Sequence, residues 1–117
     1  MSQGFPKSQR LLKRKEFRLV YDTGTVYRNA GFHLFVKQRE DLSLSRLGLT
    51  ATRSLGGAVV RNQLRRWARE TFRLAAERLE PGFDLVVNFH QGLVRMKREA
   101  FDRLFRDALQ RAHLLKP

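Results

Sequence analysis

Residues 59–73 carry the side chains with the clearest chemistry in this sequence. On a helical wheel the polar residues share one side. Four of them form a stripe, Arg61, Arg65, Arg69 and Arg73, and Asn62 and Arg66 lie beside it. The apolar members occupy the other side: Val60, Leu64, Trp67, Ala68, Leu74 and Ala75. Glu70 is the only acid in the run, so the guanidinium groups repel one another unless anions lie over them. A nucleic-acid backbone is the commonest dense array of anions, and the pattern therefore predicts phosphate binding.

A pair of aromatic residues forms the second candidate site. Phe17 and Tyr21 are four residues apart, and basic side chains flank them: Lys13, Arg14, Lys15 and Arg18. Aromatic faces beside cations commonly stack on unpaired bases. The same spacing is equally typical of a helix that packs on a core, so both interpretations stay open.

An alternating apolar segment supplies the third set of candidates. Phe32, Leu34 and Val36 share the face that we assign to the core. His33 and Phe35 then point the other way, where they are available to an RNA strand unless a helix or loop covers them.

Catalytic chemistry is what the sequence lacks. His33, His90 and His113 are scattered, and the aspartates form no metal-binding cluster. The chain has no cysteine, which excludes a disulfide framework, a cysteine-ligated zinc and a thiol nucleophile. We therefore expect a binding protein without catalytic chemistry of its own.

The composition fits a partner made of nucleic acid. The 117 residues suffice for one domain, and 24 Lys and Arg against 11 Asp and Glu give a net charge of +13. Such a surface favours polyanions, with nucleic acid ahead of anionic membrane. No apolar run approaches the roughly 20 residues that span a bilayer, and residues 1–10 lack the hydrophobic core of a secretory signal. We expect a cytoplasmic protein.

The apolar periodicity predicts one α+β domain over residues 1–117, in the order helix, strand, strand, strand, helix, strand, helix. The predicted helices are residues 13–22, about 58–79 and 97–114, and the predicted strands are residues 26–30, 32–36, 42–52 and 83–89. A mixed four-stranded sheet with helices mainly on one face accommodates these elements. Residues 1–12 are expected to form a flexible basic lead-in.

Residues 58–73 closely resemble the signature helix of the bacterial ribonuclease P protein family, in which an Arg-Asn step and paired basic residues follow a glycine-rich turn. Weaker similarity extends over nearly the whole chain: Phe5-Pro6-Lys7, Glu16-Phe17, Leu47-Gly48-Leu49 and residues 83–87. The resemblance implies a left-handed crossover between the third and fourth strands, against the usual rule.

The resemblance also implies a noncatalytic subunit of an endoribonuclease. In that family the RNA subunit removes the 5′ leader of precursor tRNA with Mg²⁺, held mainly by the RNA, and no protein partner is required. Five residues would then line the leader cleft: Lys13, Phe17, Tyr21, His33 and Phe35. Six would contact the RNA subunit and its phosphates: Arg61, Asn62, Arg65, Arg66, Arg69 and Arg73. Gln63 and His90 depart from the family pattern, because basic residues are usual at both positions.

The main alternative is a general or ribosomal RNA-binding protein without a role in tRNA processing, which would bind unrelated structured RNAs comparably. A DNA-binding regulator is disfavoured, because a strand and not a helix is predicted before the basic helix. A membrane-surface helix is disfavoured because the apolar faces are needed for the core. A free-standing nuclease would need a carboxylate cluster that the sequence lacks.

Overall fold

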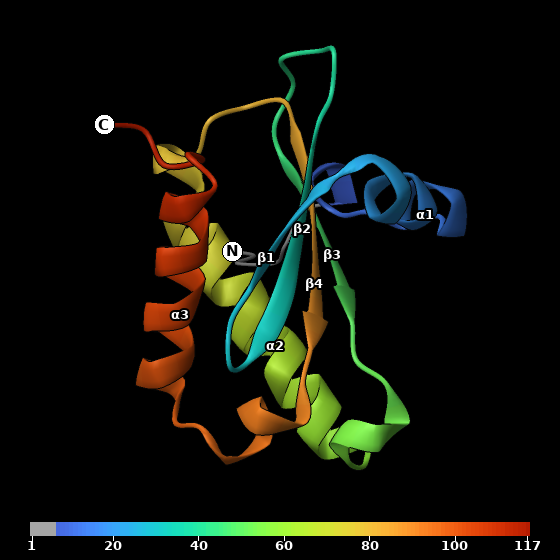
Figure 1. Ribbon diagram of the computed structural model, residues 1–117, viewed down its shortest axis with the longest axis vertical. Helices are drawn as coiled ribbons and strands as arrows, with labels where there is room; N and C mark the ends of the chain where they lie inside the picture. The colour runs from blue at the N-terminus through green and yellow to red at the C-terminus, as the bar shows by residue number, and fades with distance from the viewer. Residues whose placement is uncertain (1–6) are drawn as a thin grey trace.

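The computed structural model describes residues 7–117, which form three α-helices around a four-stranded sheet (Figure 1). The helices are α1 (Arg14–Thr23), α2 (Ala58–Ala75) and α3 (Arg98–Arg111). The strands are β1 (Thr25–Arg28), β2 (Phe32–Gln38), β3 (Arg46–Thr50) and β4 (Phe83–Phe89). Short 3-10 turns occur at residues 7–9, 53–55, 76–78 and 91–95.

The sheet is mixed, with the spatial order β1-β2-β4-β3. β2 runs antiparallel to both β1 and β4, whereas β3 runs parallel to β4. The helix α2 lies between these two parallel neighbours in the sequence, and the left-handed path implied for that connection stays a prediction. The α+β class and the order of the elements are as expected.

The two faces of the sheet are covered unequally: α1 lies on one side, and α2 and α3 lie on the other (Figure 1). Buried apolar residues under α2 and α3 form the main core, which includes Phe32, Leu34 and Phe72. A smaller cluster under α1 contains Val20 and Val86. The predicted core face of β2 is thereby confirmed, and its opposite face is turned towards α1.

The third strand is shorter than predicted. Residues 42–45 do not belong to it, and Leu42 and Leu44 are 81% and 59% exposed. They lie in a loop that Arg39 holds together, since its Nη2 atom donates hydrogen bonds to the carbonyl oxygens of Ser43 and Leu44. Leucines alternating with serines imitate a strand pattern here without a neighbouring strand to pair with.

The described end of the lead-in contacts the sheet. Residues 1–6 lie outside the described part of the chain. Arg10 forms a parallel bridge with Leu47, and the N–H of Leu11 donates to the carbonyl oxygen of Leu47 at 3.0 Å. Leu11 is buried with the α1 cluster. Residues 10 and 11 thus contact β3, and the flexibility of the lead-in stays a prediction.

The apolar side of α2 differs from the helical wheel at its C-terminal end. Phe72 is fully buried, whereas Leu74 is 70% exposed and lines a groove between α2 and α3. Both residues lie at the borders of the apolar side, and the packing of α2 on the sheet decides which border turns inward. Among the described residues, no helix is long and apolar enough to cross a membrane.

Candidate RNA-binding surfaces

The first surface, which we call the arginine face, is the outer side of α2: Arg61, Asn62, Arg65, Arg66, Arg69 and Arg73. On the inner side Leu64, Ala68 and Phe72 are buried in the main core. Their burial fixes the rotation of the helix about its axis and turns the polar side outward. All members of the arginine face are exposed except Arg61 and Arg65, which are half-buried.

Few groups of the protein neutralise the positive charges of the arginine face. Within residues 7–117 none of its arginines takes part in an ion pair. Arg65 Nη1 donates to Asn62 Oδ1 at 3.1 Å, and the buried Nε of Arg61 has no hydrogen-bond partner among the described residues. Partial burial and the charges of Arg10 and Arg65 lower the pKa of Arg69. A bound anion would relieve this repulsion and could accept the unused Arg61 hydrogen bond.

The second surface, which we call the aromatic surface, lies between α1 and the sheet: Phe17, Tyr21, His33 and Phe35. The rings of Tyr21 and Phe35 meet edge to face with centroids 4.9 Å apart, and His33 lies 6.4 Å from Phe35. All four side chains are half-buried. Each residue packs on the protein and keeps some surface exposed, so both interpretations of the aromatic pair stay open.

Phe17 lies directly over β3. A side chain at Gly48 would bring its Cβ atom within 2.7 Å of the Phe17 ring, so only glycine leaves room for it. Lys13 is the residue that precedes α1, and its side chain is exposed one turn before Phe17. The structure thus brings four predicted leader residues together and places Lys13 at the end of the same helix.

The hydroxyl of Tyr21 is held by two residues that the sequence analysis missed. It donates to Asn88 Oδ1 at 2.7 Å, and Thr50 Oγ1 lies 2.9 Å from the same oxygen. Asn88 is an uncharged polar residue inside β4, whose remaining members apart from Asp84 are apolar. This departure from the apolar pattern is the signal that could have identified Asn88. The two contacts fix the orientation of the Tyr21 ring on the sheet.

A pair of histidines extends the aromatic surface past the end of β4. The rings of His33 and His90 have centroids 4.1 Å apart. Burial, together with the charges of His90 and Arg28, lowers the pKa of His33 below its ordinary value of 6.5. This shift favours the neutral form of His33. The Nε2 atom of His90 is buried without a hydrogen-bond partner among the described residues.

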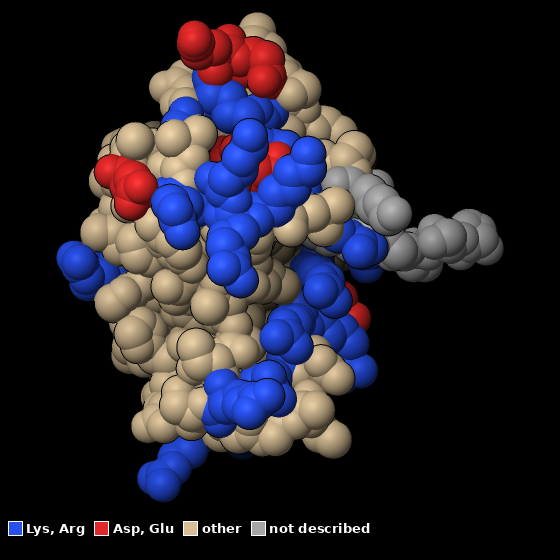
Figure 2. Space-filling model, turned by 90° about the vertical axis from the view of Figure 1, so that its right-hand side faces the viewer, with Lys and Arg blue, Asp and Glu red and all other residues tan. Residues whose placement is uncertain are grey.

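The two surfaces meet at a hollow of about 140 Å³ between the lead-in, α1 and α2. Its lining includes Phe17 of the aromatic surface and Arg65 and Arg69 of the arginine face. Figure 2 shows Lys and Arg side chains over the α1 side of the molecule and continuing below it, with few acidic side chains between them. One basic surface with an aromatic part therefore faces the solvent on this side.

Comparison with known proteins finds ribonuclease P proteins that are similar to most of this chain. A family model described as Ribonuclease P matches residues 5–113. The chain is 37% identical over 87 residues to the ribonuclease P protein component of Thermotoga petrophila, covering 74% of each sequence. It is 30% identical over 110 residues to that of Brevibacillus brevis, covering 94% of this chain and 87% of the relative.

The chain belongs to the bacterial ribonuclease P protein family. Solved structures agree: the Thermotoga maritima ribonuclease P protein superposes with a TM-score of 0.79 at 31% identity, covering 87% of this chain and 96% of that one. The Staphylococcus aureus ribonuclease P protein has the same fold, with a TM-score of 0.88 at 24% identity over 94% and 100% of the two chains. The chain is accordingly a protein subunit of ribonuclease P, acts in tRNA 5′ maturation, and has the ribonuclease P RNA as its partner.

The resemblance implies that magnesium takes part in the reaction, and the described residues do not fit that ion. Within residues 7–117 no three His, Asp or Glu side chains gather into a metal site. Two carboxylates near the start of α1, Glu16 and Asp84, are both occupied by Arg46. An all-protein magnesium site needs several free oxygen ligands.

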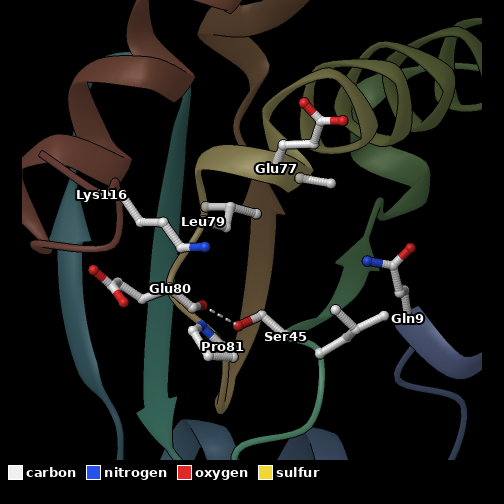
Figure 3. Close-up of a pocket in the computed structure, with 9 residues that line it drawn as sticks. Gln9, Ser45, Glu77, Leu79, Glu80, Pro81 and Lys116 are labelled. Atoms are coloured by element: carbon white, nitrogen blue, oxygen red, sulfur yellow. Dashed lines mark hydrogen bonds between the residues drawn. The ribbon is translucent and has the colours of Figure 1, made fainter.

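A larger hollow of about 410 Å³ shares no residue with either surface (Figure 3). It lies between the start of β3, the turn after α2 and the C-terminal residues. Ser45 donates to the carbonyl oxygen of Glu80 at 2.7 Å and accepts the N–H of Phe83 at 3.1 Å. These contacts join the residue before β3 to the segment that enters β4, so we assign the polar groups of this hollow a structural role.

Proposed function

We propose that this chain assists the ribonuclease P RNA with two surfaces. The arginine face binds the RNA subunit, and the aromatic surface together with Lys13 holds the single-stranded 5′ leader of precursor tRNA. The observation that carries the proposal is the junction of the two surfaces, where Phe17 and Arg65 line one hollow. An RNA subunit bound to α2 would thereby lie next to the leader bound under α1.

The arginine face suits crowded phosphates. Its side chains project from one rigid helix and have no competing carboxylates among the described residues. Each phosphate contact contributes a salt-dependence slope of about 0.9 in the logarithm of the binding constant. Binding to the RNA subunit should therefore weaken steeply as salt is added.

The aromatic surface suits leaders of many sequences. Stacking of a base on an aromatic ring contributes about 1–3 kcal/mol and tolerates any base, because every base has a π-face. The half-buried Phe17 and Phe35 pack against the buried cluster under α1. Their side chains are therefore already ordered and lose little conformational freedom on binding.

The chemical step is proposed to belong to the RNA subunit with its magnesium. The polypeptide contributes binding and orientation, and its two carboxylates near α1 are occupied by an arginine. No second protein is required by this arrangement, and the proposed location is the bacterial cytoplasm.

The test is cleavage of precursor tRNA by a bacterial ribonuclease P RNA at limiting magnesium, with and without this protein. We expect no cleavage by the protein alone and a stimulation of correct 5′ cleavage when the RNA is present. A protein that binds the RNA without stimulating cleavage would favour a general RNA-binding role instead.

A further inference from the structure

A network of ion pairs lies between the start of α1 and the sheet. Its centre is Asp84 on β4, which is 5% exposed. Arg46 on β3 binds this carboxylate with two parallel hydrogen bonds, from Nε to Oδ1 at 2.9 Å and from Nη2 to Oδ2 at 2.8 Å. Arg39 Nη1 also reaches Oδ1, at 2.6 Å. Bidentate contacts of this kind fix the plane of a guanidinium group.

The third nitrogen of Arg46 connects the network to α1. Arg46 Nη1 donates to Glu16 Oε2 at 3.1 Å, and Glu16 Oε1 accepts the backbone N–H groups of Leu12 and Lys13 at 3.2 and 3.1 Å. Glu16 therefore satisfies backbone donors at the start of the helix while it is held by the sheet. Burial acts to raise the pKa of Glu16, but these backbone hydrogen bonds and the charge of Arg46 outweigh it and lower the pKa.

The position of α1 depends on few other contacts. The helix has ten residues, fewer than an isolated helix needs to be stable, and Val20 is its only fully buried residue. The Tyr21 hydroxyl holds the second half of α1 on Asn88 and Thr50. The first half is held by the contact between Glu16 and Arg46 and by the packing of the Phe17 ring over Gly48.

We propose that Arg46 and Glu16 are positioning residues for the 5′ leader: they hold the first turn of α1 on the sheet so that Phe17 and Tyr21 present their rings to unpaired bases. This inference rests on the proposed function of the aromatic surface. Arg46 uses Nε, Nη1 and Nη2 within the network, so it acts through α1 and not as a free cation. The main core lies on the other face of the sheet and does not need this contact.

The experiment measures how much more tightly the assembled holoenzyme, RNA subunit plus protein, binds precursor tRNA than mature tRNA. Two variants break the connection to α1 in different ways. Arg46→Met removes the guanidinium group, and Glu16→Gln keeps an oxygen for the backbone N–H groups but loses the charge. We expect each to lower the precursor-to-mature preference roughly tenfold, as for the loss of one stacked base.

Arg98→Met is the matched control. Arg98 connects α2 and α3 through ion pairs with Glu70 at 2.8 Å and Asp102 at 2.9 Å, on the opposite side of the sheet from α1. Its loss should reduce stability and leave the precursor preference unchanged. An equal fall in preference for this control would show that general destabilisation explains the effect and would overturn the inference.

A double-mutant cycle separates positioning from direct binding. In a background carrying Phe17→Ala and Tyr21→Ala, Arg46→Met should cause no further loss of preference, because its effect passes through those rings. Additive losses, or an unchanged preference in both single variants, would overturn the positioning role. If the unmodified holoenzyme shows no preference for precursor tRNA, the proposed leader site itself is wrong, and this inference is wrong with it.

Discussion

The arginines of this protein have two kinds of surroundings. Arg39, Arg46 and Arg98 contact carboxylates at 2.6–3.1 Å. The arginine face of α2 has no such contact within residues 7–117. The chain has 24 basic residues and 11 acids, so one-to-one pairing would leave 13 cations without a carboxylate, and the fold decides which ones. Paired arginines connect elements of the protein, and unpaired arginines stay available to RNA.

This comparison separates stability from binding. Removing a charge from the network leaves its partners buried and uncompensated. Removing charges from the arginine face should even relieve repulsion within the free protein. The same chemical change should therefore cost folding free energy in one region and RNA affinity in the other.

The largest expected effect is on stability, from Asp84→Asn. The change leaves Arg39 and Arg46 without their shared anion in a buried place, which should lower the free energy of unfolding by about 3–5 kcal/mol. Urea denaturation measures this loss. Asp107→Asn, at an exposed position of α3, is the control and should change stability by less than about 0.5 kcal/mol. If both variants change the free energy of unfolding by a similarly small amount, the ion-pair network does not stabilise the fold as this comparison requires.

The next effect is on assembly, from Arg65→Ala combined with Arg66→Ala. Two lost phosphate contacts should weaken binding to the RNA subunit roughly 30-fold at 0.15 M salt and reduce the salt slope by about 2. Stability should change little. Arg103→Ala with Arg106→Ala removes the same charge from exposed positions of α3. If that pair weakens assembly as much, net charge and not the arginine face determines affinity.

A smaller effect is expected from Phe17→Ala combined with Tyr21→Ala. Precursor tRNA should bind about tenfold more weakly, through lost base stacking, while mature tRNA binding is little changed. Leu19→Ala, at a 51% exposed position of the same helix, should alter neither. Equal losses of affinity for precursor and mature tRNA would show that the aromatic surface does not bind the leader.

The smallest effect concerns pH. Burial and the charges of His90 and Arg28 hold the pKa of His33 below 6.5, so this imidazole gains its proton only as the pH falls below that value. The added charge should strengthen leader binding about fivefold or less, on the order of 1 kcal/mol for a charge pair that water largely screens. The unfolded chain takes up this proton more readily, so the free protein should lose stability over the same range.

The ratio of precursor to mature affinity at pH 7.5 and 5.5 measures this change, since effects common to both RNAs cancel. His33→Gln should abolish the difference. A difference that persists in the variant would assign the titration to another group.

Local patterns were sufficient to predict most of the secondary structure. The alternation in β2 and the apolar run of β4 gave the observed strands, because each has one face or both faces buried in the sheet. The Gly24 that follows α1 marked the end of that helix within a residue. Residues 42–45 were misassigned because alternation alone does not reveal whether a neighbouring strand is present.

The candidate surfaces were predictable only where their members share an element. The arginine face lies on one helix, so its spacing identified it. The supports of the aromatic surface do not share an element: Glu16, Arg46 and Asp84 come from a helix and two strands. No spacing rule connects such distant positions, and the parallel register of β3 and β4 brings Arg46 opposite Asp84.

The short bridge between Arg10 and Leu47 has a consequence for how the protein behaves in concentrated solution. β3 is the last strand of the sheet, and an outer strand with free backbone groups is a template for self-association. The bridge and the Leu11 hydrogen bond occupy part of that template. A chain shortened to begin at residue 13 would uncover it, and we expect such a chain to aggregate although both RNA-binding surfaces are still present.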